Sequence, residues 1–355
     1  MLPEIPPTPT KASNRRRNIR LLGCGGIVVV LIVAGWLLLH EPQLIDRAER
    51  VTNVTNYAWI DDHQLLWAMP NSAHLSRIDL RAHDQRLITA ANTYSDSKSW
   101  VSMDVSSVAQ GGKHALTAIT TKSDQEYPSV VARPSLIDLE GRFTRELDSG
   151  ESPVWMPDGR RWLALDTEER YRNESNPKPE AWLFSIDAPH QKAGPIAIPA
   201  QVKSLVGVTP DERLVMTDLP AGIDEPAVTV WQQGIYLNPA PPTQGRLNAP
   251  HGWFYREAAL SPKADRIAWV LTTSGVPRPL AFLHRILPGV FRNVAPTRTF
   301  ELATSRLNGK DIRSLGFQDG GKDNAGVITN LKWNPDGRRL SFVYRGNLYI
   351  LPANH

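Results

Sequence analysis

Short apolar stretches alternate with polar turns along most of the chain, and one such turn recurs. The stretch "WMPDGRRWLAL" (155–165) is nearly repeated as "WNPDGRRLSFV" (333–343). In both, an apolar strand ends, a turn rich in Pro, Asp and Gly reverses the chain, and a second apolar strand begins. Used as a template, this pattern also matches residues 59–69, 108–118, 208–218 and 260–270.

The copies recur at intervals of about 50 residues, the period typical of repeat proteins such as β-propellers. A third apolar strand follows each pair, and a fourth usually follows that. The pattern predicts an all-β fold, a six-bladed β-propeller with four-stranded blades over residues 57–355. The turn residues that we expect to be structural are Pro157, Asp158, Gly159, Pro210, Asp211, Pro262, Pro335, Asp336 and Gly337.

The last copy lacks a fourth strand, because the chain stops soon after its third strand "NLYIL" (347–351). Residues 48–54, "AERVTNV", precede the first copy and belong to no other blade. We predict that they supply the missing outer strand, which would close the ring and remove an exposed sheet edge.

Residues 21–39 carry no charge and are long enough to cross a bilayer as one transmembrane helix. Arg15, Arg16, Arg17 and Arg20 precede them, so the positive-inside bias places a cytoplasmic Pro/Arg-rich tail at residues 1–20. Residues 40–56 then form a tether and the closing strand. The propeller would be periplasmic or extracellular, with the bacterial inner membrane as the expected location. The alternatives are a cleaved signal peptide and lipidation at Cys24, the single cysteine.

The basic balance of the chain comes from its N-terminus. Five of the 40 Lys and Arg residues and one of the 36 Asp and Glu residues lie in the first 40 positions, which leaves 35 of each sign for the rest. Because the predicted propeller is neutral, nucleic-acid binding is disfavoured.

The long insertions are expected between second and third strands, at 120–134, 166–180, 218–227 and 271–299. Such connections share one face of a propeller, and loops on a rigid scaffold commonly carry binding. If the closing strand is the outer strand of the last blade, the tether enters on the opposite face. The decorated face is then expected to point away from the membrane.

The longest insertion contains "RPLAFLHRILPGVFRN" (278–293), in which apolar residues recur at helical spacing among arginines. We consider it a candidate partner-docking loop, with a helix packed on its own blade and a segment lying on lipid headgroups as the alternatives. The residues of this candidate loop are Arg278, Leu280, Phe282, Leu283, Arg285, Ile286, Leu287, Phe291 and Arg292.

The "PDGRR" and "TPDERL" elements resemble the repeats of the TolB-type propeller, which also occur in the propellers of prolyl oligopeptidase-like enzymes. The resemblance covers residues 57–351. It implies a scaffold without catalytic residues, and for TolB itself a periplasmic protein that binds partners in the cell envelope. This chain differs from TolB in the anchor predicted at its start.

Signatures of catalysis are weak. The chain has no G-x-S-x-G nucleophile elbow, and "GFQDGGKD" (316–323) has Asp323 where a phosphate-binding loop needs Ser or Thr. We therefore expect no cofactor and a non-catalytic protein-binding or scaffold module with an envelope partner. The first alternative is a six-bladed lactonase or hydrolase with a metal in the channel. The second is a sensor that binds a small molecule and signals through the span.

Overall fold

The computed structural model describes residues 42–69, 74–90, 99–123, 130–140, 144–146, 151–165, 179–219, 226–235, 241–275, 296–320 and 326–353. The chain divides into two units, residues 1–42 with 276–294 and residues 43–275 with 295–355. The second unit contains every described helix and strand. No helix among the described residues is long and apolar enough to cross a membrane, and the predicted span 21–39 lies outside them.

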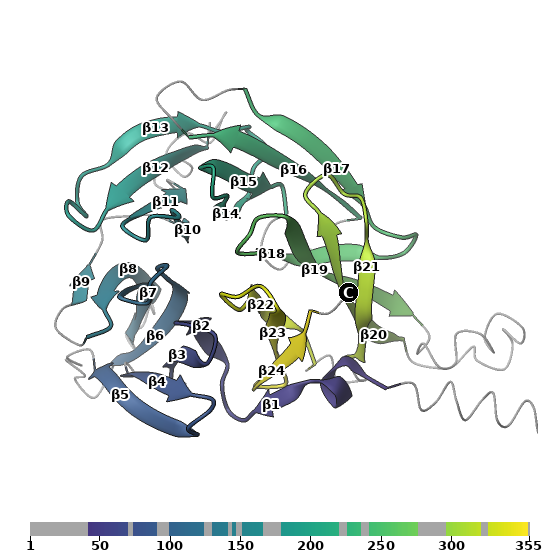
Figure 1. The fold of residues 1–355 in the computed structure, drawn as a ribbon, viewed down its shortest axis with the longest axis horizontal. Helices are drawn as coiled ribbons and strands as arrows, with labels where there is room; N and C mark the ends of the chain where they lie inside the picture. The colour runs from purple at the N-terminus through teal and green to yellow at the C-terminus, as the bar shows by residue number, and fades with distance from the viewer. Residues whose placement is uncertain are drawn as a thin grey trace, which may run out of the picture. The chain divides into compact units, whose positions relative to one another are not determined.

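Six four-stranded antiparallel sheets form the blades of the second unit, arranged in a ring (Figure 1). The first three blades are β2 (Asn56–Trp59), β3 (Gln64–Ala68), β4 (His74–Asp79) and β5 (Asp84–Ala90); β6 (Ser99–Val108), β7 (His114–Ser123), β8 (Val130–Asp138) and β9 (Thr144–Glu146); and β10 (Glu151–Trp155), β11 (Arg161–Leu165), β12 (Glu180–Ser185) and β13 (Ala193–Ala197).

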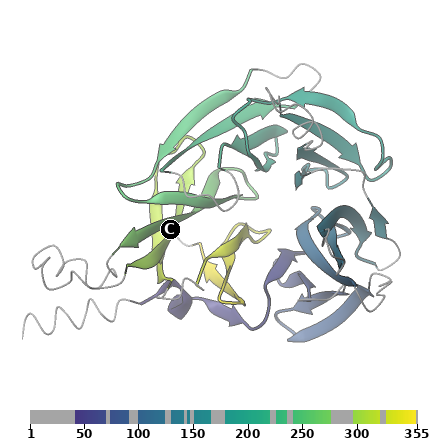
Figure 2. The ribbon, with the colours of Figure 1, turned by 180° about the vertical axis from the view of Figure 1, so that it is seen from behind.

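The other three are β14 (Ser204–Val208), β15 (Arg213–Thr217), β16 (Ala227–Gly234) and β17 (Thr243–Asn248); β18 (Phe254–Leu260), β19 (Arg266–Gly275), β20 (Thr297–Arg306) and β21 (Arg313–Asp319); and β22 (Thr329–Trp333), β23 (Arg339–Tyr344), β24 (Asn347–Pro352) and β1 (Glu49–Val51). The predicted all-β, six-bladed propeller is confirmed. The view from behind shows the same ring (Figure 2).

Strand β1 closes the ring. It pairs antiparallel with β24, with Glu49 opposite Ile350 and Val51 opposite Leu348. The closing strand therefore lies within residues 48–54, the segment expected to supply it. Its pairing gives the last blade its outer strand and covers an edge that would otherwise be open.

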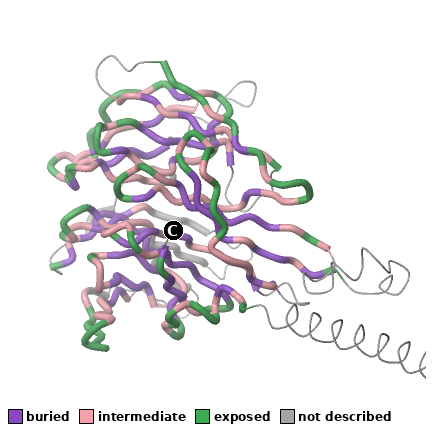
Figure 3. Tube along the Cα trace, turned by 45° about the vertical axis from the view of Figure 1, so that its right-hand side comes forward, coloured by how far each residue is buried: buried purple, intermediate pink, exposed green. Residues whose placement is uncertain are grey.

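The hydrophobic core lies in the seams between neighbouring blades. The buried apolar side chains form six clusters, and each cluster joins two adjacent blades. At the seam between the last and first blades, for example, Trp59 and Trp67 pack with Val343 and Leu348. Figure 3 shows buried residues along the strands and exposed residues at the turns and along outer strands, and β13 is exposed at four of its five residues. The apolar strands of the repeat thus bury both faces of each sheet.

Because each blade is an antiparallel meander, its connections alternate between two faces of the ring. The turn face carries the connections from first to second and from third to fourth strands. The loop face carries the connections from second to third strands and from blade to blade. These two names are kept below.

Two of the long insertions are shorter than predicted. Strands β7 and β8 pair as far as Lys122 opposite Val130, and β19 and β20 as far as Gly275 opposite Thr297. Thr121 and Val131, expected in a loop, pair with each other and continue the sheet. Both hairpins therefore reach farther toward the loop face than the five-residue strands of other blades.

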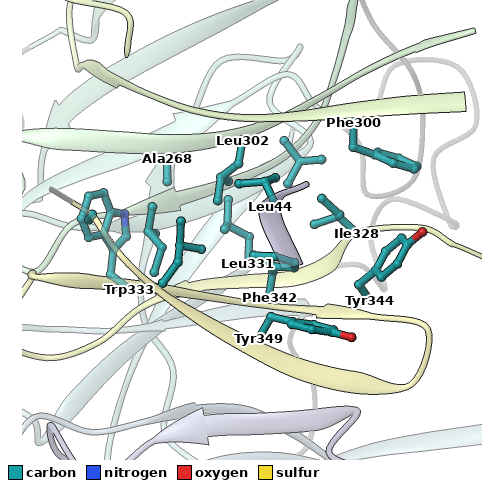
Figure 4. Close-up of a cluster of buried hydrophobic side chains, with 14 residues drawn as sticks. Leu44, Ala268, Phe300, Leu302, Ile328, Leu331, Trp333, Phe342, Tyr344 and Tyr349 are labelled. Carbon is teal, nitrogen blue, oxygen red and sulfur yellow. The ribbon is translucent and has the colours of Figure 1, made fainter. Parts of the chain in front are cut away.

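The tether does not approach on the opposite face as predicted. A short 3₁₀ helix, η1 (Leu44–Arg47), precedes β1 and packs along β21. Leu44 is fully buried between the last two blades, among Phe300, Leu302 and Phe342 (Figure 4). Because η1 and β1 reverse the chain, Gln43 returns to the loop face, where its Oε1 accepts a hydrogen bond of 2.8 Å from the Asp319 backbone N–H.

Candidate functional site

The repeated turns contact one another around the turn face. The Asp158 carboxylate accepts hydrogen bonds from the Arg160 and Arg161 backbone N–H groups at 2.8 and 3.0 Å, so it holds its own turn. Arg161 also reaches the next blade, where its Nη2 lies 3.0 Å from Glu212 Oε1. Between the last and first blades, the Asp336 backbone N–H donates to Asp62 Oδ1 at 2.8 Å. These side chains hold the turns together, and their polar groups are engaged in doing so.

The inner strands of five blades contain β-bulges. Pairing with the second strand shifts register in β6, β10, β14, β18 and β22. A bulge leaves a residue without a pairing partner and redirects its side chain or backbone. The bulged residues Ser106, Val206, Arg256, Asn330 and Leu331 all line one cavity in the middle of the ring. Four blades therefore contribute irregular backbone to the same place.

This channel cavity has a volume of about 410 Å³, within the range of small-molecule sites. Its other lining residues are Val105, Ser204, Thr217, Leu219, Glu257, Ala258 and Lys332. Thr217 ends β15 and pairs with Ser204, the first residue of β14, so both stand at the loop-face end of their strands. The cavity therefore extends from the middle of the channel toward the loop face.

Lys332 crosses the channel. Its Nζ donates a hydrogen bond of 2.9 Å to the Ser106 carbonyl, two blades away, and lies 5.6 Å from the centroid of the Tyr57 ring. Burial lowers the pKa of this amine to about 8, and the nearby Glu257 carboxylate offsets part of that effect. With a pKa near 8 the amine is still mostly protonated at neutral pH, and it retains donors for a further acceptor.

Glu257 stabilises the bulge of β22. Its Oε2 accepts a hydrogen bond of 2.9 Å from the Leu331 backbone N–H. Burial raises the pKa of this carboxyl, while hydrogen bonds from the Leu331 and Asn330 backbone N–H groups lower it in part. The carboxylate is thus partly engaged by backbone that the bulge left unpaired.

Thr217 lines the cavity with a hydroxyl group that has no hydrogen-bond partner among the described residues. Its side chain is 1% exposed. A buried hydroxyl without a partner costs free energy, on the order of 1–3 kcal/mol. A ligand that accepts a hydrogen bond from this hydroxyl would explain why it is unpaired in the protein alone.

A second cavity, of about 470 Å³, lies on the turn face between Asp61, Asp62, Arg77 and Asp336. Asp61 Oδ1 accepts hydrogen bonds from the His63 and Gln64 backbone N–H groups at 2.7 and 2.8 Å. The Asp61 and Asp62 carboxylates therefore already serve turn geometry, as Asp158 does. Among the described residues there is no group of three or more His, Cys, Asp or Glu side chains arranged to hold a metal ion.

The structure brings the predicted turn residues together and leaves the predicted docking loop undescribed. The nine turn residues lie on the turn face, where Gly337 contacts Pro262 of the neighbouring blade and Gly159 lies against the Gln110 carbonyl. All nine residues of the candidate docking loop, from Arg278 to Arg292, lie outside the described residues. Of the glycine-rich stretch 316–323, residues 316–319 belong to strand β21.

The channel site escaped the sequence pattern, although a signal for it exists. Lys332 stands one residue before the aromatic end of its inner strand. The aligned residues of the other copies are small or apolar: Ala58, Ser107, Val154, Gly207 and Ala259. Lys332 is therefore the one charged residue at a position where the other five copies have a small or apolar residue, and this difference indicates a role other than packing. Thr217 gives no such signal, because its missing partner is visible only in three dimensions.

No protein-family model matches the chain, and no curated protein matches it in sequence. Solved structures resemble its fold at low identity. A chain of a mitotic checkpoint complex is 10% identical, with 89% of this chain and 95% of that chain covered and a TM-score of 0.48. The β-propeller domain of the Trilobed protease from Pyrococcus furiosus is 12% identical, with 86% and 83% covered and a TM-score of 0.42. A gluconolactonase from Xanthomonas campestris is 12% identical, with 87% and 91% covered and a TM-score of 0.44. The chain is therefore a six-bladed β-propeller by its own strand pairing, with similarity to other propellers in fold alone.

Proposed function

We propose that this protein is a membrane-anchored, non-catalytic propeller of the cell envelope that binds a protein partner lying at the membrane. The span is residues 21–39, the N-terminus is cytoplasmic, and the propeller stands in the periplasm or outside the cell. The TolB-type character of the repeats belongs to the same proposal. A β-propeller suits a protein-binding scaffold because its rigid ring presents loops from several blades on one face.

One observation supports this proposal most. Gln43, near the start of the described residues, accepts a hydrogen bond from Asp319 of β21, and the adjacent Gly320 backbone N–H donates to the Arg298 carbonyl of β20 at 2.7 Å. Arg298 is the second residue of β20, immediately after the insertion that contains the candidate docking loop. The tether and the root of that insertion are thus neighbours on the loop face.

This neighbourhood changes the expected orientation. If residues 21–39 cross the membrane, a tether leaving the loop face turns that face toward the bilayer. A basic, amphipathic segment such as 278–292 would then meet a partner embedded in the membrane or resting on it. The charge of the propeller is balanced. We therefore assign the binding of the partner to this basic segment and not to the ring as a whole.

The test is affinity purification of the full chain in mild detergent, with bound proteins quantified by mass spectrometry. The variant Leu283→Asp/Leu287→Asp should reduce recovery of a specific partner at least tenfold, because it places charge on the apolar side of the predicted helix. A second variant replaces residues 277–294 with a short Gly-Ser linker and keeps the pairing of Gly275 with Thr297.

The matched control is Leu87→Asp on β5, a leucine that is 56% exposed. It should leave both recovery and melting temperature unchanged. Equal partner recovery from all variants would contradict docking through this loop. A fall in melting temperature without loss of a partner would assign the loop to packing on its own blade. Loss of binding to anionic lipid vesicles, with protein partners unchanged, would assign it to lipid headgroups.

A further inference from the structure

The channel cavity contains hydrogen-bond donors that find no acceptor among the described residues. Lys332 Nζ has three N–H donors, and one described acceptor, the Ser106 carbonyl, lies within hydrogen-bond distance. The Thr217 hydroxyl has none in the described part of the chain. Both residues line the same cavity: Thr217 stands at the loop-face end of β15, and Lys332 reaches across the channel from near the turn-face end of β22. One cavity therefore contains two side chains whose N–H or O–H donors are not all taken up by described acceptors.

We propose that the channel cavity binds a small organic carboxylate, whose oxygens accept hydrogen bonds from Lys332 Nζ and the Thr217 hydroxyl. The site is independent of the docking loop, since it is built from the inner strands of the ring. Its volume of about 410 Å³ suits a small molecule and excludes a folded segment.

The hydrogen-bonding groups of the lining favour an anion. Lys332 has spare N–H donors, while Glu257, the one carboxylate among the lining residues, already accepts the Leu331 backbone N–H. An added anion would restore full charge to an amine that burial makes easier to deprotonate. A cationic ligand would instead have to displace the hydrogen bonds that hold the β22 bulge.

The same lining favours a carboxylate over a phosphate. Glu257 stands in the cavity wall beside Lys332 and repels each added negative charge, and the desolvation cost of an ion grows faster than its charge. A monoanion therefore fits better than a dianion. The side chains of Ser106, Ser204 and Asn330 line the rest of the cavity and offer hydrogen bonds to hydroxyl groups of the ligand.

The experiment measures how fast Lys332 is acetylated by acetic anhydride in the full chain in detergent at pH 7.5, by peptide mass spectrometry. The probes are acetate, lactate, gluconate and inorganic phosphate, each at millimolar concentration. At least one carboxylate should slow acetylation of Lys332 tenfold or more, by covering the amine and keeping it protonated. Lys263, exposed on the turn face, is the internal control and should react at an unchanged rate.

The proposal is overturned if none of the three carboxylates slows Lys332 more than twofold, which would leave the lysine a strut across the channel. Protection by phosphate alone would also overturn it and assign the cavity to phosphate compounds.

A variant tests the site without removing the strut. Thr217→Val preserves shape and deletes the unpartnered hydroxyl, so the melting temperature without probe should not fall. Protection of Lys332 should then require at least tenfold more carboxylate. Thr243→Val, at an exposed threonine on β17, is the matched control and should leave protection unchanged. Protection that is identical in Thr217→Val and the parent chain would remove Thr217 from the site.

Discussion

At the scale of the residue, the repeated turn places one backbone position in the left-handed region. Gly159 and Gly337 occupy it with φ of 62° and 72°, while Glu212 and Ala264 occupy it in other blades with φ of 56° and 54°. Glycine adopts this conformation without a steric penalty, and other residues are strained by about 1–2 kcal/mol. The chain thus uses a strained residue at two turns where glycine would fit.

We predict that Ala264→Gly stabilises the propeller by about 0.5–1 kcal/mol. The substitution relieves backbone strain, and the greater conformational entropy of the unfolded chain offsets part of that gain.

Gly337→Ala should destabilise the propeller by about 1 kcal/mol. The cost comes from φ alone, because an added Cβ would lie 3.7 Å from Pro262, an ordinary contact distance. Gly159→Ala should cost more, since its Cβ would approach the Gln110 carbonyl oxygen to 2.4 Å. Urea denaturation of the three variants gives the order, and equal effects at Gly159 and Gly337 would contradict it.

The buried amine predicts a pH dependence of stability. The pKa of Lys332 is lowered from 10.5 to about 8, so between these values the unfolded chain binds more protons than the folded chain. The unfolding free energy contributed by this group therefore rises with pH across that window. The groups facing it are Glu257 and Arg256 on β18 and Tyr57 on β2.

Between pH 8 and pH 9.5, the parent chain should gain on the order of 1 kcal/mol relative to Lys332→Met. The measurement is urea denaturation at a series of pH values in one buffer mixture. Parallel pH curves for the two proteins would show that the channel does not depress the pKa of this amine.

At the scale of the element, the repeat pattern predicted the blades because each apolar strand serves the same purpose in each copy. The closing strand was predictable for the same reason, since the last blade otherwise lacks an edge. Helix η1 was not, because four residues carry no periodicity. It forms where Leu44 finds a buried place between two blades, a cause that lies in tertiary packing. The channel site was missed for a similar reason: Glu257, Lys332 and Thr217 belong to three blades and meet only in the ring.

Leu44→Ala tests whether η1 fastens the tether. Leu44 is fully buried and lies 3.0 Å from where a Cβ on Gly316 would stand, so its truncation leaves a cavity that close-packed neighbours cannot fill. We predict a loss of about 3 kcal/mol in unfolding free energy. Leu87→Ala, at an exposed leucine, is the control and should cost under about 0.5 kcal/mol. Similar losses in both variants would show that η1 contributes no packing.

At the scale of the whole molecule, the two faces of the ring are built differently. The turn face is tied together by residues of the repeat, such as Arg161 with Glu212. The loop face carries the long hairpins, Gln43 and one end of the channel cavity. A ring anchored as proposed above would present the loop face and that end of the cavity toward the membrane surface.

The most direct test is the distance of each face from the membrane. Thr52, exposed in the β1–β2 connection on the loop face, and Lys263, exposed on the turn face, are each replaced by cysteine in a Cys24→Ser chain. Each is labelled with a fluorescent donor, and the chain is reconstituted in vesicles with acceptor-labelled lipid headgroups. We predict stronger energy transfer from position 52, with position 263 farther from the headgroups by at least a strand length, about 17 Å. Equal transfer from the two positions, or stronger transfer from position 263, would contradict a loop face turned toward the membrane.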